Sequence, residues 1–240
     1  MNQCFKGGRM TRRRCLTQAL AWVLGCLCLG CSTPNLNVRV VRTPEGVLRV
    51  DAPWAGPYET MEELAEDGCE KVTSQPGASH GDANGEYGME YCALHYYSPE
   101  DQAYYLSFLS NVGGNGPDGM KFCVVPRAIN ELNRKSYILL GPAHNHPHNR
   151  EFSRPDTGKG RPLGWSPLGT SRVFDRETQR VWDRELLVFY RERDGRCSTF
   201  KYNYFTRLVY ALRDGAWVSI GKAEGQYGRV TLFDGQEWLP

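Results

Sequence analysis

The sequence predicts an α+β fold, with one early helix followed by mixed strands. Three observations support this class. Residues 60–72 show helical periodicity, the apolar pattern changes to period two after residue 86, and 26 glycines with 14 prolines indicate many turns. With 240 residues, of which 40% are hydrophobic, the chain is long and apolar enough for one large domain with a core.

Residues 1–31 have the pattern of an export signal. Five basic residues and no acid precede a short apolar stretch, which ends in Cys-Leu-Gly-Cys at 28–31. This end resembles the lipobox of bacterial lipoproteins, which implies a signal peptide and acylation of Cys31, for example with palmitate. Cys26, in Val-Leu-Gly-Cys, is the alternative site. We therefore expect a lipid-anchored protein of the cell envelope, and Ser32 favours the outer membrane, facing the periplasm or the surface.

The charge of the chain argues against a nucleic-acid partner. The net charge of +2 falls to −3 without the five positive charges of residues 1–30. The mature chain is therefore mildly acidic, and the membrane is expected as a partner through the lipid anchor.

The first elements of the mature chain are a tether with a hairpin, followed by a helix. Residues 32–57 contain two short alternating runs on either side of a Pro-Glu-Gly turn. The helix is expected over 60–72, because Thr60 and Glu63 have the spacing of a capping box and an apolar stripe follows them.

The rest of the chain is expected to be mostly strands. The one further helix or turn is predicted at 128–135. Strands are predicted at 86–97, 103–110, 121–126, 136–144, 185–192 and 198–205, and a last hairpin at 208–221 turns at Asp214-Gly215.

Four cysteines follow the signal region, namely Cys69, Cys92, Cys123 and Cys197. An even number in an exported chain predicts two disulfides, in any of three pairings, with four buried thiols as the alternative. The absence of Cys-x-x-Cys spacing argues against a zinc site made of thiolates alone.

The segment 144–156 has the spacing of a metal site. On a strand, His144 and His146 point to the same face, and neutral imidazole is a good zinc ligand. Asp156 is the candidate third ligand. Ser153 is a suitable N-cap for a helix that would hold Asp156 toward the histidines. His148 is interpreted as a loop side chain.

The pattern His144-x-His146-Pro followed by Ser153-x-x-Asp156 resembles the motif of the JAB/MPN (JAMM) metallopeptidases, in particular their bacterial toxin or peptidase branch. Glu86, in Glu-Tyr-Gly after the helix, matches the upstream glutamate of that motif. The resemblance covers a catalytic domain at 58–160, with 161–240 as a strand-rich C-terminal part of the same domain. It implies a cytidine deaminase-like mixed sheet with flanking helices.

The resemblance also implies roles for these residues. His144, His146 and Asp156 would bind Zn²⁺, Glu86 would act as general base, and Ser153 would donate to the oxyanion. Glu90 is the rival for the base. The implied function is an exported zinc metallopeptidase or isopeptidase acting on peptide or protein substrates, such as cell-wall peptides. Two alternatives stay open: a non-catalytic binding or assembly module, and a structural zinc site closed by His148.

Overall fold

The computed structural model describes residues 34–79, 88–116, 121–130, 136–158 and 166–239. The predicted signal peptide, with Cys26 and Cys31, lies outside these ranges. Leu36–Pro240 forms one compact unit. No helix within the described ranges is long and apolar enough to cross a membrane.

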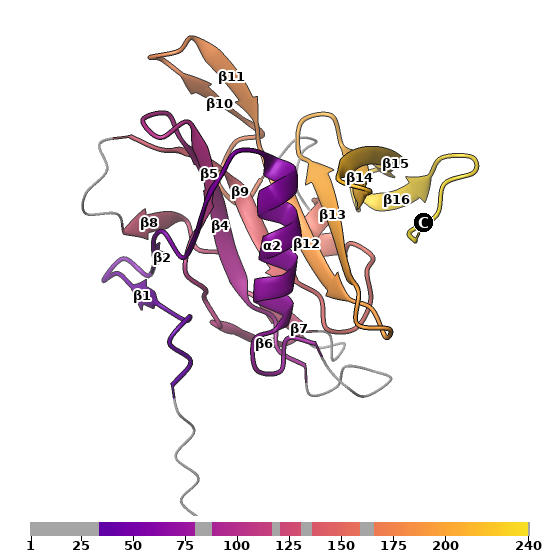
Figure 1. Ribbon diagram of the computed structural model, residues 1–240, viewed down its shortest axis with the longest axis horizontal. Helices are drawn as coiled ribbons and strands as arrows, with labels where there is room; N and C mark the ends of the chain where they lie inside the picture. Colours follow the sequence, from indigo (N-terminus) through magenta and orange to yellow (C-terminus); the bar gives the residue numbers. More distant parts are fainter. Residues whose placement is uncertain (1–33, 80–87, 117–120, 131–135, 159–165, 240) are drawn as a thin grey trace, which may run out of the picture. The chain divides into compact units, whose positions relative to one another are not determined.

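A mixed sheet of nine strands is the centre of the unit (Figure 1). Strands β12 and β9 are parallel, and the other neighbours are antiparallel. In order across the sheet, the strands are β16 (Arg229–Leu232), β15 (Ala216–Glu224), β14 (Leu208–Arg213), β13 (Cys197–Asn203), β12 (Glu185–Arg191), β9 (Ile138–Asn145), β4 (Cys92–Ser98), β5 (Ala103–Leu106) and β3 (Ala55–Tyr58).

Three small sheets complete the strand content of the described residues. The predicted N-terminal hairpin is confirmed, and β8 joins it where a helix or turn was expected at 128–135. That expectation is wrong for 128–130, because these residues pair in parallel with β2. The sheets are β1 (Val40–Arg42), β2 (Leu48–Asp51) and β8 (Ala128–Asn130); β6 (Gly113–Asn115) with β7 (Lys121–Cys123); and β10 (Arg172–Asp175) with β11 (Arg180–Asp183).

The predicted helix is confirmed as α2 (Met61–Thr73), with Thr60 as its N-cap. The Thr60 hydroxyl accepts a hydrogen bond of 3.2 Å from the backbone N–H of Glu63, which satisfies one of the free N–H groups of the first turn. The helix lies across one face of the large sheet (Figure 1) and buries Leu64 and Cys69 there.

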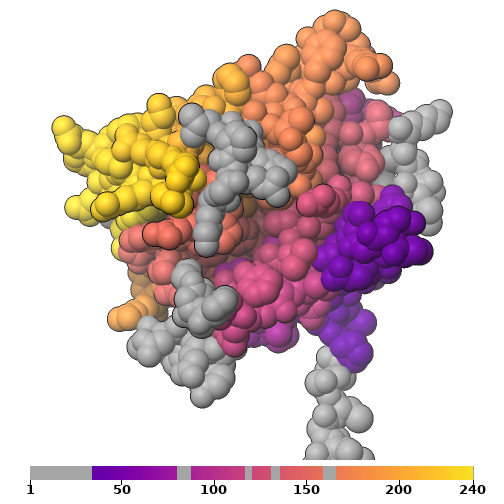
Figure 2. Space-filling view, turned by 180° about the vertical axis from the view of Figure 1, so that it is seen from behind, coloured from indigo at the N-terminus to yellow at the C-terminus, as the bar shows by residue number. Residues whose placement is uncertain are grey.

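The two faces of the large sheet are covered in different ways. Ala143 in β9 and Leu187 in β12 belong to the apolar cluster beneath α2. Their neighbours His144 and Val188 point to the opposite face, because side chains alternate along a strand. Figure 2 shows the molecule from behind, with this face toward the viewer. Val50 of β2 and Ile129 of β8 pack there against Leu94 of β4.

The predicted α+β class, a JAB/MPN-like sheet with flanking helices, is wrong, because the fold is mostly β. Within the described residues the only helices are α2 and α3 (Arg154–Thr157). Helix α3 has four residues and ends at Gly158, whose φ of 111° is in the left-handed region that favours glycine. The sheet formed by β1, β2 and β8 packs Val50 and Ile129 where a second helix layer was expected.

Two disulfides link distant parts of the unit. Cys69 of α2 is bonded to Cys197 of β13, and Cys92 of β4 is bonded to Cys123 of β7. This is one of the three pairings that the sequence left open. The first bond attaches α2 to the sheet, and the second attaches the β6–β7 hairpin beside the end of β9.

Candidate metal centre

The end of β9 brings two imidazoles together. The Nε2 atoms of His144 and His146 lie 2.9 Å apart, and both side chains are buried. The backbone N–H of His146 donates to the carbonyl of Phe189 at 2.9 Å, so the contact with β12 continues one residue beyond the strand. The predicted same-face arrangement of the two histidines is thus present, and the pair faces away from α2.

Asp156 completes the group from a different segment of the chain. Its Oδ1 lies 3.3 Å from His144 Nε2, and its Oδ2 lies 3.3 Å from His146 Nε2. The backbone N–H and the hydroxyl of Ser153 both donate to Oδ2, at 2.7 and 2.6 Å. The first turn of α3 therefore fixes the carboxylate against the two imidazoles.

The electrostatics of the group keep Asp156 ionised. Burial raises the pKa of its carboxyl, but the charges of His144 and His146 and their hydrogen bonds outweigh burial. The pKa of Asp156 is held well below its ordinary value. The ionised carboxylate is the form of this group that can bind a metal ion.

The three residues fit a zinc ion. Two imidazole nitrogens and one carboxylate oxygen form a common ligand set of catalytic zinc. With bond lengths of about 2.0–2.1 Å, ligand atoms at the corners of a tetrahedron lie about 3.3 Å apart. The observed separations of 2.9 to 3.3 Å are close to this value. The group thus has the shape and the chemistry for one ion.

A cavity of about 640 Å³ opens beside the three ligands, and Glu90 and Ser153 also line it. Catalytic zinc sites keep one coordination position free for water or substrate, whereas structural sites are closed by a fourth protein ligand. Among the described residues, His148 belongs to neither group of side chains that are close enough to share an ion. It lines a separate cavity beside Arg150, which agrees with its interpretation as a loop residue.

Glu90 is the carboxylate that faces the ligands. Cys92 of β4 pairs with His144 of β9, so Glu90, two residues before Cys92, lies level with His146. Burial raises the pKa of Glu90 to about 8. The negative charge of Asp156 adds to this rise, while His146 opposes it. Glu86, the predicted base, lies outside the described residues.

Asn145, between the two histidines, fixes the segment that contains Glu90. Its amide nitrogen donates to the carbonyls of Ala78 and Met89 at 2.8 and 2.9 Å, and its side-chain oxygen accepts from the N–H of Tyr91 at 2.8 Å. The residues on both sides of Glu90 are thus bonded to one fully buried side chain. The motif positions the candidate base as well as the metal ligands.

The cavity walls come from widely separated parts of the chain, from Glu90 to Tyr204. Two cationic side chains, Lys121 and Arg154, lie among them. Burial raises the pKa of Tyr204 well above its ordinary value, so its phenol stays protonated and able to donate a hydrogen bond. The apolar wall residues are Phe122, Val125, Pro142, Pro167 and Leu186.

The sequence predicted the candidate ligands, which the structure brings together, but not the walls of the cavity. Phe122 and Tyr204 are more than eighty residues apart, and both come from segments predicted as strands. Nothing in the spacing of either segment indicates a cavity. His95 is fully buried in β4, and burial lowers its pKa to about 3.

Comparisons with protein-family models, with curated proteins and with solved structures find no match to this chain.

Proposed function

We propose that this protein is a zinc-dependent hydrolase of peptide or isopeptide bonds. The observation that supports the proposal is the convergence of His144, His146 and Asp156 beside an open cavity that also contains Glu90. The resemblance to JAB/MPN metallopeptidases is proposed for the motif alone, since the fold is mostly β and α2 is the only helix longer than four residues in the described ranges. Export and a lipid anchor at Cys31 remain part of the proposal.

The ligands His144, His146 and Asp156 would hold the ion through two Nε2 atoms and one carboxylate. Zinc in such a site acidifies water to a pKa of about 7 and polarises a carbonyl group. Bound zinc would also lower the pKa of Glu90, because a nearby cation favours the carboxylate. Glu90 would then be ionised at neutral pH and able to accept a proton.

Glu90 is assigned as general base and acid. Its carboxylate would accept a proton from the attacking water and pass it to the nitrogen of the leaving amine, since both atoms must lie in the cavity that Glu90 lines. The proposed role of Ser153, donation to the oxyanion, requires its hydroxyl to turn away from Asp156, to which it donates at 2.6 Å. Tyr204 is a second protonated hydroxyl on the same cavity.

The cavity favours substrates with apolar side chains near the cleaved bond, because Phe122, Val125 and Leu186 form its walls. The anchor proposed for the N-terminus would place the site in the cell envelope, where cross-linking peptides of the wall and exported proteins are available. The competing function is a binding module that keeps the ion without catalysis.

The test compares four variants of the purified protein. Glu90→Gln is expected to keep one zinc ion per chain and to lose about 10²- to 10⁴-fold in kcat on peptide or isopeptide substrates. His144→Ala is expected to lose the zinc, and His148→Ala to keep both properties. Glu86→Gln separates the two candidate bases, since only the true base loses kcat with zinc retained. Stoichiometric zinc without hydrolysis of any peptide would favour the binding module.

A further inference from the structure

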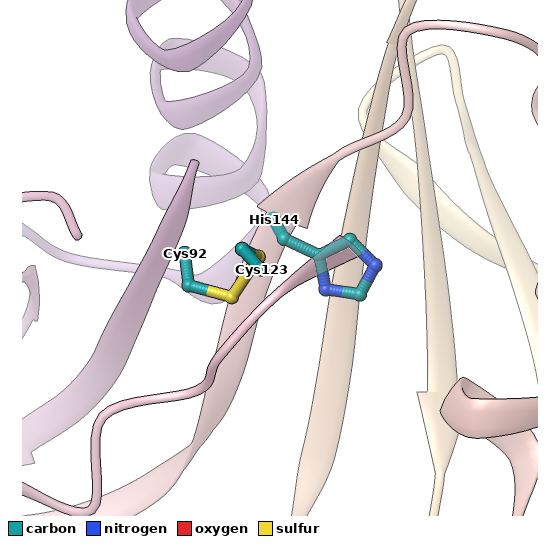
Figure 3. A group of neighbouring side chains, drawn as sticks. All are labelled: Cys92, Cys123 and His144. Atoms are coloured by element: carbon teal, nitrogen blue, oxygen red, sulfur yellow. A yellow bond between two sulfur atoms is a disulfide. The ribbon is translucent and has the colours of Figure 1, made fainter. Parts of the chain in front are cut away.

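A second group of side chains that could hold a metal shares His144 with the first. The Sγ atoms of Cys92 and Cys123 and a ring nitrogen of His144 all lie within 4.8 Å of one another. In the structure the two sulfurs form a disulfide, so neither is a thiolate able to bind a metal (Figure 3). One edge of the imidazole faces this disulfide, and the other faces His146 and Asp156.

The ring nitrogen on the disulfide side is orphaned. His144 Nδ1 is buried, and no described residue forms a hydrogen bond with it. A histidine that binds a metal ordinarily donates its second ring N–H to a carboxylate or a carbonyl, which fixes the tautomer. Here the neighbour is a pair of sulfur atoms, and the oxidised pair is a poor partner. Because His144 Nδ1 lacks a hydrogen-bond partner, the sulfur atoms beside it are the candidate groups for an interaction with this nitrogen.

We propose that reduction of the Cys92–Cys123 disulfide creates a second metal site, formed by the two thiolates and His144 Nδ1. Thiolates and imidazole are good ligands for zinc. The two sites exclude each other, because a neutral imidazole has one nitrogen with a free lone pair and a proton on the other. His144 thus binds a metal through Nε2 when the disulfide is closed, or through Nδ1 when it is open.

The redox step is thiol–disulfide exchange with a dithiol. A thiolate of the dithiol attacks Cys123 Sγ, on the side that lines the cavity, and the fully buried Cys92 leaves as a thiolate. The second sulfur of the dithiol then attacks the mixed disulfide and releases Cys123. Two electrons pass to the protein, and the dithiol becomes a cyclic disulfide. Its two protons go to the cysteines, or to solvent once the metal binds.

This inference rests on the proposed function, because it assigns the hydrolytic site to the oxidised state. The hydrolase would then acquire its site only after oxidative folding. In a reducing compartment, metal would be held by the sulfurs, away from Glu90.

Cobalt tests the inference, because Co²⁺ bound to thiolate has a strong near-ultraviolet charge-transfer band that nitrogen and oxygen ligands lack. The parent variant is Cys69→Ser/Cys197→Ser, in which Cys92 and Cys123 are the only cysteines after the signal region. Oxidised, it is expected to bind one Co²⁺ per chain without the band. Reduced with a phosphine, it is expected to bind one Co²⁺ with the band. Alkylation of the two thiols, or Cys92→Ser/Cys123→Ser added to the parent variant, should abolish the band.

Two results would overturn the inference. One is the absence of the thiolate band in the reduced parent variant, and the other is two Co²⁺ ions per reduced chain, which would show that the sites do not exclude each other. Failure of the proposed hydrolytic site looks different. In that case the oxidised protein would bind no Co²⁺, although the reduced protein still showed the band.

Discussion

The face of the sheet beneath α2 and the opposite face at the end of β9 are built from neighbouring residues, yet their chemistry differs. Ala143 packs into an apolar cluster with Leu64 and Phe189, while His144 meets an imidazole and a carboxylate. Burial of apolar area on the first face stabilises the fold. Burial of charged groups on the second face costs part of that stability. Strand alternation lets one strand serve both purposes.

The disulfides follow the same division. Cys69–Cys197 links α2 to the sheet and closes a separation of 128 residues, whereas Cys92–Cys123 closes one of 31 residues beside the ligands. In the chain-entropy view the longer loop stabilises more, by roughly 1 kcal/mol. The bond on the helix face therefore gives the larger stabilisation in this view, whereas the bond on the site face is the one that we propose to control metal binding.

The largest expected effect is a loss in the free energy of unfolding, tested with one variant on each face of the sheet. Leu64→Ala, on the helix face, should lower the free energy of unfolding by about 2–5 kcal/mol and leave zinc stoichiometry unchanged. Leu186→Ala is the matched variant on the site face. It should cost a similar amount and also raise KM, because Leu186 lines the cavity. Urea unfolding and zinc analysis measure both. Zinc loss from folded Leu64→Ala would contradict the division.

A smaller effect is expected from Asn145, which joins the two parts of the site. Asn145→Ala leaves two carbonyls and one N–H without their buried partner and should cost about 1–3 kcal/mol. It should also lower kcat while zinc is retained, because Glu90 loses its support. The exposed Asn149→Ala serves as control and should change stability by less than about 0.5 kcal/mol. An unchanged kcat in Asn145→Ala would show that Asn145 does not position Glu90 for catalysis.

The third expected effect is a pH dependence of the stability of the zinc-free protein. The pKa of Glu90 is raised in the folded state to about 8, from an ordinary value of 4.5. Glu90 therefore contributes fully to the free energy of unfolding below about pH 4.5. This contribution is lost as the pH rises toward 8, by at most about 1.4 kcal/mol per pH unit. Urea unfolding of chelator-treated protein from pH 5 to 8 should show this loss, and Glu90→Gln should abolish it.

Asp156 provides the internal comparison for that experiment. Its pKa is lowered on folding, so its contribution is present above about pH 4 and is lost only on further acidification. The Glu90→Gln variant should still lose stability at acid pH, because Asp156 is unchanged. A variant that lost both pH dependences would indicate a general loss of structure rather than the removal of one carboxyl group.

Local features of the fold were predictable because their physics is local. Thr60 and Glu63 are three residues apart and cap α2 by themselves, and the Asp214-Gly215 turn joins β14 to β15. The 128–135 prediction failed because Ile129 pairs with Val50, almost eighty residues upstream. Long-range pairing overrode a weak local preference. The prediction of flanking helices failed for a similar reason, since β2 and β8, which pair across almost eighty residues, pack against the sheet where a second helix layer was expected.

The sequence alone determined the ligand types and their spacing in His144, His146 and Asp156, because a strand end and a four-residue turn present them in a fixed way. It also determined that four cysteines were available for two bonds. Only the tertiary structure decided which cysteines pair, that Glu90 faces the ligands, and that Phe122 and Tyr204 enclose them. These features depend on strand order and register, which are set by the packing of segments far apart in the chain.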